Sequence, residues 1–208
     1  MSTTSRRYSD YLNEVFVYTK QDYRIDALVK AFPLKPFKAV ADAARDREAE
    51  TWKTGKRGKY FPYIQLPHVS FLKSVLPLVK RGNHFIDIGC GGGDKLAMVH
   101  LLGKPKVRLT GIEIDPITAK EAVRLCPFAN IVVGDAIKHS YETYDVLYAY
   151  VPISDYKLWK KLQNRVAKTM KSGAVFVVFG ASSGPDLKFK YDNQTSGNWG
   201  SPAIYRKP

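Results

Sequence analysis

The chain of 208 residues is long enough for one full-sized domain with a small extension, and it is too short for two ordinary domains. Apolar residues make up 45% and charged residues 25%, a globular composition that excludes wholesale disorder. The longest apolar run, residues 174–179, is too short to cross a bilayer, and two cysteines (Cys90 and Cys126) predict no disulfide framework. The first residues lack the apolar core of a secretory signal, so we expect a cytoplasmic protein that spans no membrane.

The net charge of the chain points to a binding partner. Lys and Arg number 33 against 19 Asp and Glu, which leaves a net charge of +14. An excess of this size, spread along the whole chain, favours a polyanion or an acidic surface as the partner. A basic protein without such a partner is the alternative, because net charge describes association and not chemistry.

The first part of the chain predicts a basic, helical extension over residues 1–60, in front of a domain formed by residues 61–208. Apolar residues recur at helical spacing before Pro33. We expect Pro33 and Pro36 to interrupt the helix, which resumes over residues 39–52 with good helix formers.

Residues 61–208 alternate apolar strands with amphipathic helices. Five apolar runs predict strands that are buried on both faces of a parallel sheet: HFIDIG, VRLTGIEI, NIVVGD, YDVLYAYV and AVFVVFG. Residues 94–102 predict a helix, and another is expected to begin at Pro116. The segments LKFKY and PAIYRKP predict an antiparallel hairpin at the sheet edge. The sequence therefore predicts an α/β fold with a doubly wound, mostly parallel sheet.

Two further helices carry specific expectations. Residues 67–80 predict a helix with a kink at Pro77. The helix before the fifth strand is expected to turn one side toward the sheet through Leu158, Leu162, Val166 and Met170. Its other side carries only basic charges, from Lys157, Lys160, Lys161, Arg165, Lys168 and Lys171. A solvated outer face is the favoured interpretation of this side, and a phosphate-binding stripe is the alternative.

The strongest local signal is FIDIGCGGGDK, in which a buried strand must turn sharply into a helix. The turn contains Gly89, Gly91, Gly92 and Gly93. Glycine is needed where the backbone adopts positive φ or where a ligand comes within contact distance. The N–H groups of the loop and of the helix that follows can hold acceptor groups of a ligand. A tight turn with no ligand is the alternative interpretation.

Acidic residues end the next two strands. Glu113 ends the second strand, where a carboxylate can accept from both hydroxyls of a ribose, and Asp135 follows the third, where it can accept from the exocyclic amine of a purine. Together with the glycine loop, they predict one site for a molecule with a ribose and an adenine. A dinucleotide is disfavoured because Asp94 would repel its pyrophosphate, and the chain has no P-loop sequence.

The motifs D-I-G-C-G-G-G, E-I-D and G-D-A together resemble those of the class I S-adenosylmethionine-dependent methyltransferases, over about residues 62–179. The resemblance implies a seven-stranded sheet with a terminal hairpin, and it implies S-adenosyl-L-methionine as the cofactor. It places the methionine moiety over the glycine loop, the ribose on Glu113 and the adenine beside Asp135 and Ala136. The cofactor-binding residues that it implies are Tyr63, Asp87, Gly89, Cys90, Gly91, Gly93, Glu113, Ile114, Asp135 and Ala136.

Tyr63 enters this set through a narrower resemblance. The segment FPYIQLP is similar to the PYVPTP-type segment of a branch that contains small protein-lysine methyltransferases, which places Tyr63 near the methionine end of the cofactor. The threonine of that segment is absent here. A half-buried aromatic residue before a helix is the alternative interpretation of Tyr63.

The end of the fourth strand is where the family places residues that meet the methyl acceptor. Tyr150 and Pro152 are therefore the candidate catalytic residues. The segment lacks the Asn or Asp that is typical of enzymes that methylate the amino groups of bases. We expect Asp155 to cap the helix that follows. The four histidines lack metal-ligand spacing, so no metal is expected.

The sequence thus predicts an S-adenosylmethionine-dependent methyltransferase with a macromolecular acceptor, of which nucleic acid (RNA) is slightly favoured. A protein-lysine N-methyltransferase is one alternative, and a non-catalytic cofactor-binding subunit of an RNA–protein assembly is the other. Transfer of a methyl group from a sulfonium mainly requires that donor and acceptor are held in line. A clear cofactor site without an obvious general base is consistent with this chemistry.

Overall fold

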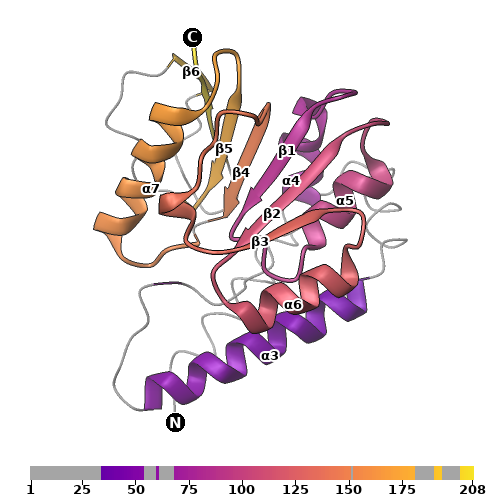
Figure 1. Cartoon of the computed structure of the whole chain (residues 1–208), viewed down its shortest axis with the longest axis vertical. Helices are drawn as coiled ribbons and strands as arrows, with labels where there is room; N and C mark the ends of the chain where they lie inside the picture. Colours follow the sequence, from indigo (N-terminus) through magenta and orange to yellow (C-terminus); the bar gives the residue numbers. More distant parts are fainter. Residues whose placement is uncertain (1–33, 54–59, 61–67, 151, 181–189, 194–201) are drawn as a thin grey trace.

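The computed structural model describes residues 34–53, 60, 68–150, 152–180, 190–193 and 202–208 (Figure 1). The strands are β1 (His84–Ile88), β2 (Arg108–Glu113), β3 (Asn130–Val133), β4 (Val146–Tyr150), β5 (Val175–Phe179), β6 (Lys190–Asn193) and β7 (Ala203–Arg206). The helices are α3 (Leu34–Lys53), α4 (His68–Ser74), α5 (Asp94–Leu102), α6 (Pro116–Leu125) and α7 (Tyr156–Thr169), with short 3-10 helices η1 (Leu76–Leu78) and η2 (Ala136–Lys138).

These strands form one sheet in the order β3-β2-β1-β4-β5-β7-β6. The first five pair in parallel, whereas β7 runs antiparallel to both of its neighbours, β5 and β6. The predicted α/β class, the mostly parallel sheet and the antiparallel C-terminal pair are confirmed. The helices predicted over residues 94–102 and from Pro116 are also found.

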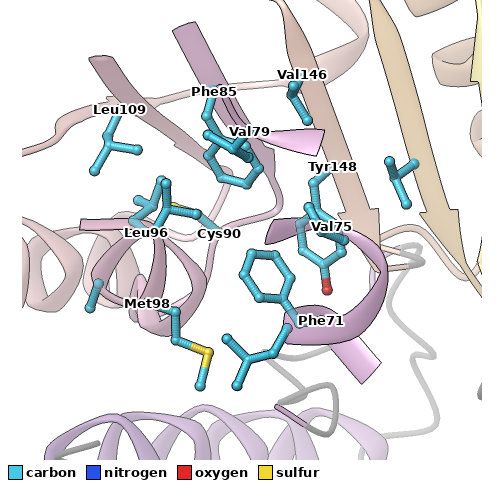
Figure 2. Close-up of a cluster of buried hydrophobic side chains, with 14 of the residues drawn as sticks. Phe71, Val75, Val79, Phe85, Cys90, Leu96, Met98, Leu109, Val146 and Tyr148 are labelled. Carbon is cyan, nitrogen blue, oxygen red and sulfur yellow. The ribbon is translucent and has the colours of Figure 1, made fainter. Parts of the chain in front are cut away.

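The central strands are buried on both faces because helices cover both sides of the sheet. On β1, Phe85 belongs to one apolar cluster and Ile86 and Ile88 to another. Figure 2 shows the first cluster, in which Phe71 from α4 packs edge-on against Tyr148 from β4, with ring centroids 5.1 Å apart. Continuous apolar runs in the sequence are what two buried faces require.

The second face of the sheet is covered by α7. The predicted inward residues Leu162, Val166 and Met170 are buried, and Leu158 is half-buried. Gln163 is also fully buried, which the spacing of apolar residues did not predict. Asp155 accepts a hydrogen bond of 3.0 Å from the N–H of Leu158, so the predicted helix cap is confirmed.

The basic side of α7 is partly used for contacts within the protein. Arg165 donates a hydrogen bond of 3.0 Å to the carbonyl of His139, and Lys171 lies 2.5 Å from the Asp145 carboxylate. Arg165 therefore connects the helix to a neighbouring segment, and Lys171 does the same for the residues just after the helix. The exposed basic residues on this side include Lys157, Lys161 and Lys168.

The expected effects of Pro36 and Pro77 on their helices are both wrong. Helix α3 begins at Leu34 instead of position 39 and contains Pro36 in its first turn. Proline is tolerated there because the N–H that it lacks would have no partner within the helix. The helix predicted over 67–80 is not kinked: α4 ends at Ser74, and Pro77 lies in the separate 3-10 helix η1.

Helix α3 lies along α6 on the outside of the molecule (Figure 1). Its buried side includes Phe37, Val40, Ala41 and Ala44. The rest of the predicted extension, residues 1–33 and 54–59, is outside the described residues. No helix in the described part of the chain has the length and apolar character needed to cross a bilayer.

Candidate cofactor-binding site

The candidate residues after β1 and β2 meet because the loop after β1 is hydrogen-bonded to β2. The N–H groups of Gly89 and Cys90 donate to the carbonyl of Ile112 at 2.8 and 3.0 Å. The residue after β3 is joined to β2 in the same way, because the N–H of Gly134 donates to the carbonyl of Glu113 at 2.9 Å. The carboxyl ends of β1, β2 and β3 therefore form one continuous edge, as the sequence predicts.

Glycine is sterically required at two positions of the glycine loop. Gly89 has φ +77°, and a Cβ there would lie 2.5 Å from Cβ of Pro152. Gly93 has φ +87° as the residue before α5, and a Cβ there would lie 2.7 Å from Sγ of Cys126. Both positions combine a left-handed backbone with a close neighbour, so each excludes any side chain.

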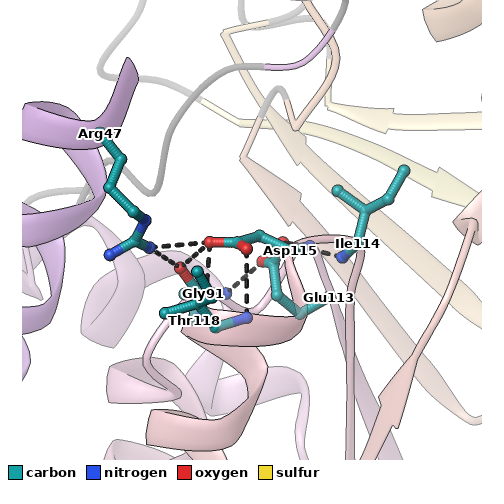
Figure 3. Close-up of polar contacts among 7 residues, drawn as sticks. Arg47, Gly91, Glu113, Ile114, Asp115 and Thr118 are labelled. Carbon is teal, nitrogen blue, oxygen red and sulfur yellow. Dashed lines mark hydrogen bonds and ion pairs between the residues drawn. The ribbon is translucent and has the colours of Figure 1, made fainter. Parts of the chain in front are cut away.

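Glu113 turns its carboxylate back toward the glycine loop (Figure 3). Its Oε2 accepts from the N–H of Gly91 at 2.9 Å, while Oε1 accepts from the N–H groups of Ile114 and Asp115 at 2.8 and 2.9 Å. Burial raises the pKa of Glu113, and these three N–H donors offset part of that rise. The carboxylate is thus held in one orientation by backbone groups from two loops.

Three more ionisable side chains are buried on either side of the same loop, Asp87 in β1 before it and Asp94 and Lys95 at the start of α5 after it. Asp87, Asp94 and Lys95 are each at most 3% exposed, and Nζ of Lys95 lies 2.6 Å from the Asp94 carboxylate. Burial raises the pKa of Asp87 well above its usual value, and the negative charges of Asp94 and Glu113 raise it further, against the opposing effect of Lys95. Such a concentration of buried acids is unfavourable for folding and is typical of functional sites.

Asp135 and Ala136 lie at the far end of this edge, where η2 begins. The Asp135 carboxylate accepts a hydrogen bond of 2.9 Å from the N–H of Ile137 and so caps η2. Tyr60 forms an antiparallel bridge with Ile153, and burial followed by the charge of Asp135 raises the pKa of Tyr60. Tyr60 therefore reaches this edge from the N-terminal side of the chain, which sequence analysis missed.

The remaining predicted residues differ in what they can offer to a ligand. The Cys90 side chain is 1% exposed and faces β2, where a Cβ at Gly111 would lie 2.6 Å from its sulfur, so this side chain is not available to a ligand. Ile114 is 38% exposed. Tyr150 is half-buried, and Pro152 lies against Gly89, which brings the end of β4 beside the loop. Tyr63 is outside the described residues.

A second residue that sequence analysis missed is Arg47 on α3. It lies 2.8 Å from both the Asp115 carboxylate and the hydroxyl of Thr118, two residues at the start of α6 (Figure 3). Among the described residues, no cluster of three or more His, Cys, Asp or Glu side chains could hold a metal ion. Three histidines have ring contacts instead: His84 with Tyr144, His100 with Phe128, and His139 with Tyr141 and Tyr144.

Comparison with known proteins finds similarity in structure only. No family model and no curated protein matches the chain. The structure resembles a TehB-like S-adenosylmethionine-dependent methyltransferase from Corynebacterium glutamicum, with a TM-score of 0.53 and 17% identity over 80% of this chain and 100% of that one.

Two other solved structures are similar over a smaller part of the chain. The [4+2]-cyclase SpnF has a TM-score of 0.46 and 16% identity over 53% of this chain and 44% of its own. A phosphoethanolamine N-methyltransferase from Haemonchus contortus, in complex with S-adenosylhomocysteine, has a TM-score of 0.46 and 19% identity over 57% of this chain and 29% of its own. The match therefore spans less than half the length of each of these two proteins. The chain has the Rossmann-like fold of the class I S-adenosylmethionine-dependent methyltransferases.

Proposed function

We propose that this protein binds S-adenosyl-L-methionine and transfers its methyl group to an acceptor. The observation that carries the proposal is the fixed contact between Glu113 and the glycine loop. A buried carboxylate is held there by N–H donors at the carboxyl end of a parallel strand, beside a loop that excludes side chains at Gly89 and Gly93. Ligands of open α/β sheets bind outside the carboxyl ends of the strands.

The residues present fit this cofactor. A carboxylate oxygen can accept two hydrogen bonds, and Oε2 of Glu113 accepts one from the described residues, which leaves capacity for a ribose hydroxyl. Asp135 keeps acceptor capacity in the same way, for an adenine amino group. The Asp87 carboxylate would then lie on the side of the positively charged methionine end of the cofactor. The exposed Ile114 side chain would cover one face of the adenine.

The bound cofactor supplies an electrophilic methyl group, and the task of the chain is to place the acceptor in line with it. Proximity and orientation alone can lower such a barrier by about 7–11 kcal/mol. Tyr150 and Pro152 are the residues that we propose for the acceptor side, since Pro152 lies against the glycine loop. An amine acceptor needs no protein base, because its ammonium form can lose a proton to solvent before the neutral amine enters the site.

For the acceptor we propose a macromolecule, with RNA favoured over protein. Helix α7 starts just after Pro152, and its first residue, Tyr156, is 54% exposed with Nζ of Lys160 at 6.0 Å from its ring centroid. Lys157 and Lys161 are exposed on the same turns. An exposed aromatic ring among lysines can stack on a base while the lysines meet phosphates. The neighbours whose names give a substrate act on small molecules, so a small acceptor is the competing outcome.

Radiolabel transfer tests both the reaction and the acceptor. The protein is incubated with the methyl-labelled cofactor and separate fractions of RNA, DNA, protein and small metabolites. We expect label in RNA that falls strongly in Tyr156→Ala, while Lys168→Gln, at the other end of α7, serves as the matched control. Label in the protein or metabolite fraction would support methyl transfer and overturn the proposal that RNA is the acceptor. No label in any fraction would overturn the proposal of methyl transfer itself.

A further inference from the structure

Arg47 connects helix α3 to the segment that follows the candidate ribose carboxylate. The guanidinium donates hydrogen bonds of 2.8 Å to Oδ2 of Asp115 and to the hydroxyl oxygen of Thr118 (Figure 3). Asp115 is also the cap of α6, and its carboxylate accepts from the N–H groups of Ile117 and Thr118. One contact thus joins α3 to the N-terminus of α6.

The same contact continues to Glu113. The Asp115 N–H donates to Oε1 of Glu113 at 2.9 Å, and the neighbouring Ile114 N–H donates to the same oxygen. The orientation of the carboxylate therefore depends on the backbone at residues 114 and 115. Asp115 is fixed on one side by the helix that it caps and on the other by Arg47, so a change at Arg47 is transmitted to Glu113 through a single residue.

The contact is suited to positioning and poorly suited to stabilising the fold. Both side chains of the Arg47–Asp115 pair are 38% exposed, and pairs of this kind contribute little to stability. Arg47 is nevertheless held firmly, because the helix that carries it is anchored by the buried side chains of Phe37, Val40 and Ala44. One terminal nitrogen of the Arg47 guanidinium donates to both oxygens, and the planar group fixes the direction of its N–H bonds.

We propose that Arg47 is a positioning residue for Glu113, the carboxylate that would bind the ribose. Helix α3 would thereby contribute to cofactor binding. This inference rests on the proposed function, because it assumes that Glu113 binds the cofactor. It predicts coupling in both directions: Arg47 favours ligand binding, and a bound ligand holds α3 more firmly in place.

The test compares Arg47→Met and Arg47→Lys with Lys38→Met, a matched loss of charge on the same helix. Lys38 contacts Asp42, one turn away on α3. Calorimetry with S-adenosylhomocysteine is carried out at a temperature at which every variant is folded. We expect Kd to rise about threefold to tenfold in Arg47→Met, less in Arg47→Lys, and to stay within twofold of the wild type in Lys38→Met.

Two readouts separate positioning from a general loss of structure. Asp115→Asn keeps a helix-capping side chain, and in that background Arg47→Met should raise Kd no further. Ligand binding should also slow amide exchange in α3 of the wild type and leave it unchanged in Arg47→Met.

The results distinguish this inference from the proposed function. A wild type that does not bind S-adenosylhomocysteine overturns the proposed function itself. If the wild type binds and Arg47→Met has the same Kd, the role of Arg47 alone is overturned. The same conclusion holds if the ligand protects α3 equally in both proteins.

Discussion

The carboxylate of Glu113 accepts a hydrogen bond of 2.9 Å from the backbone N–H of Gly91, on the loop that follows the neighbouring strand β1. This contact joins the two motifs that the sequence places 22 positions apart. It holds an acidic group at the edge of the sheet, although burial opposes its charge. We interpret the unfavourable burial of charge here as the result of selection for binding.

Replacing Asp87 by Asn is expected to stabilise the free protein while weakening cofactor binding. Burial, first, and the charges of Asp94 and Glu113 raise the pKa of Asp87. The folded state therefore holds this proton more tightly than the unfolded state, so the stability of the wild type falls as pH rises above the usual pKa of an aspartate. Thermal unfolding should show a Tm gain for Asp87→Asn that is larger at pH 8 than at pH 5.

Each kcal/mol of this gain corresponds to about 2–4 °C in Tm for a chain of this size. Asp46→Asn, on the exposed side of α3, is the matched control and should leave Tm nearly unchanged at both pH values. A Tm that falls in Asp87→Asn, or a gain that does not depend on pH, would show that the buried charge does not destabilise the protein.

The glycine at position 89 is expected to be required for the shape of the loop. Gly89→Ala meets both a left-handed φ of +77° and a contact of 2.5 Å with Pro152, whereas Gly82→Ala meets a φ of +79° with no atom within 4 Å. The backbone term alone costs about 1–2 kcal/mol. Denaturant unfolding should therefore show a larger loss of stability for Gly89→Ala, by about 1–3 kcal/mol. Equal losses in the two variants would contradict the contact with Pro152.

Both cysteines are expected to be unreactive in the folded protein. Burial raises the pKa of the Cys126 thiol to about 12 and that of Cys90 well above its usual value, with nearby acids contributing in both cases. The thiolate is the reactive form, so its population at pH 8 is small. Mass spectrometry after iodoacetamide treatment should find both residues unmodified under native conditions and alkylated in denaturant. Rapid native labelling of either residue would show that this part of the core opens.

The parts of the fold that the sequence predicts well are those decided by local pattern. The apolar runs of β1, β2, β4 and β5 are buried on both faces as predicted, and α5 and α6 have clear starting points at Asp94 and Pro116. The same expectation is wrong for β3, which lies at the sheet edge and is partly exposed. Two further errors concern Pro36 and Pro77, where the effect of proline depends on the turn in which it lies. A proline in a sequence indicates a break without showing on which side of it the helix lies.

The parts of the site that could not be predicted depend on contacts between distant segments. Arg47 is one charge among many on an exposed helix, and its partner Asp115 lies 68 positions away. Tyr60 reaches the site only because it pairs with Ile153. Neither residue belongs to a motif. Glu113 and Asp135, in contrast, could be placed at one edge from the sequence, because consecutive parallel strands end on the same side of a sheet.

Calorimetric titration with S-adenosylmethionine tests the central claim most directly. The wild type should bind one equivalent, and Glu113→Ala should abolish detectable binding. Glu121→Ala, which removes a carboxylate from α6 that pairs with Arg124, should bind like the wild type. Circular dichroism would show that each variant is folded, with Glu113→Gln as a second variant at the same position. Equal affinity in the wild type and in a folded Glu113 variant would contradict the assignment of this edge of the sheet as the cofactor site.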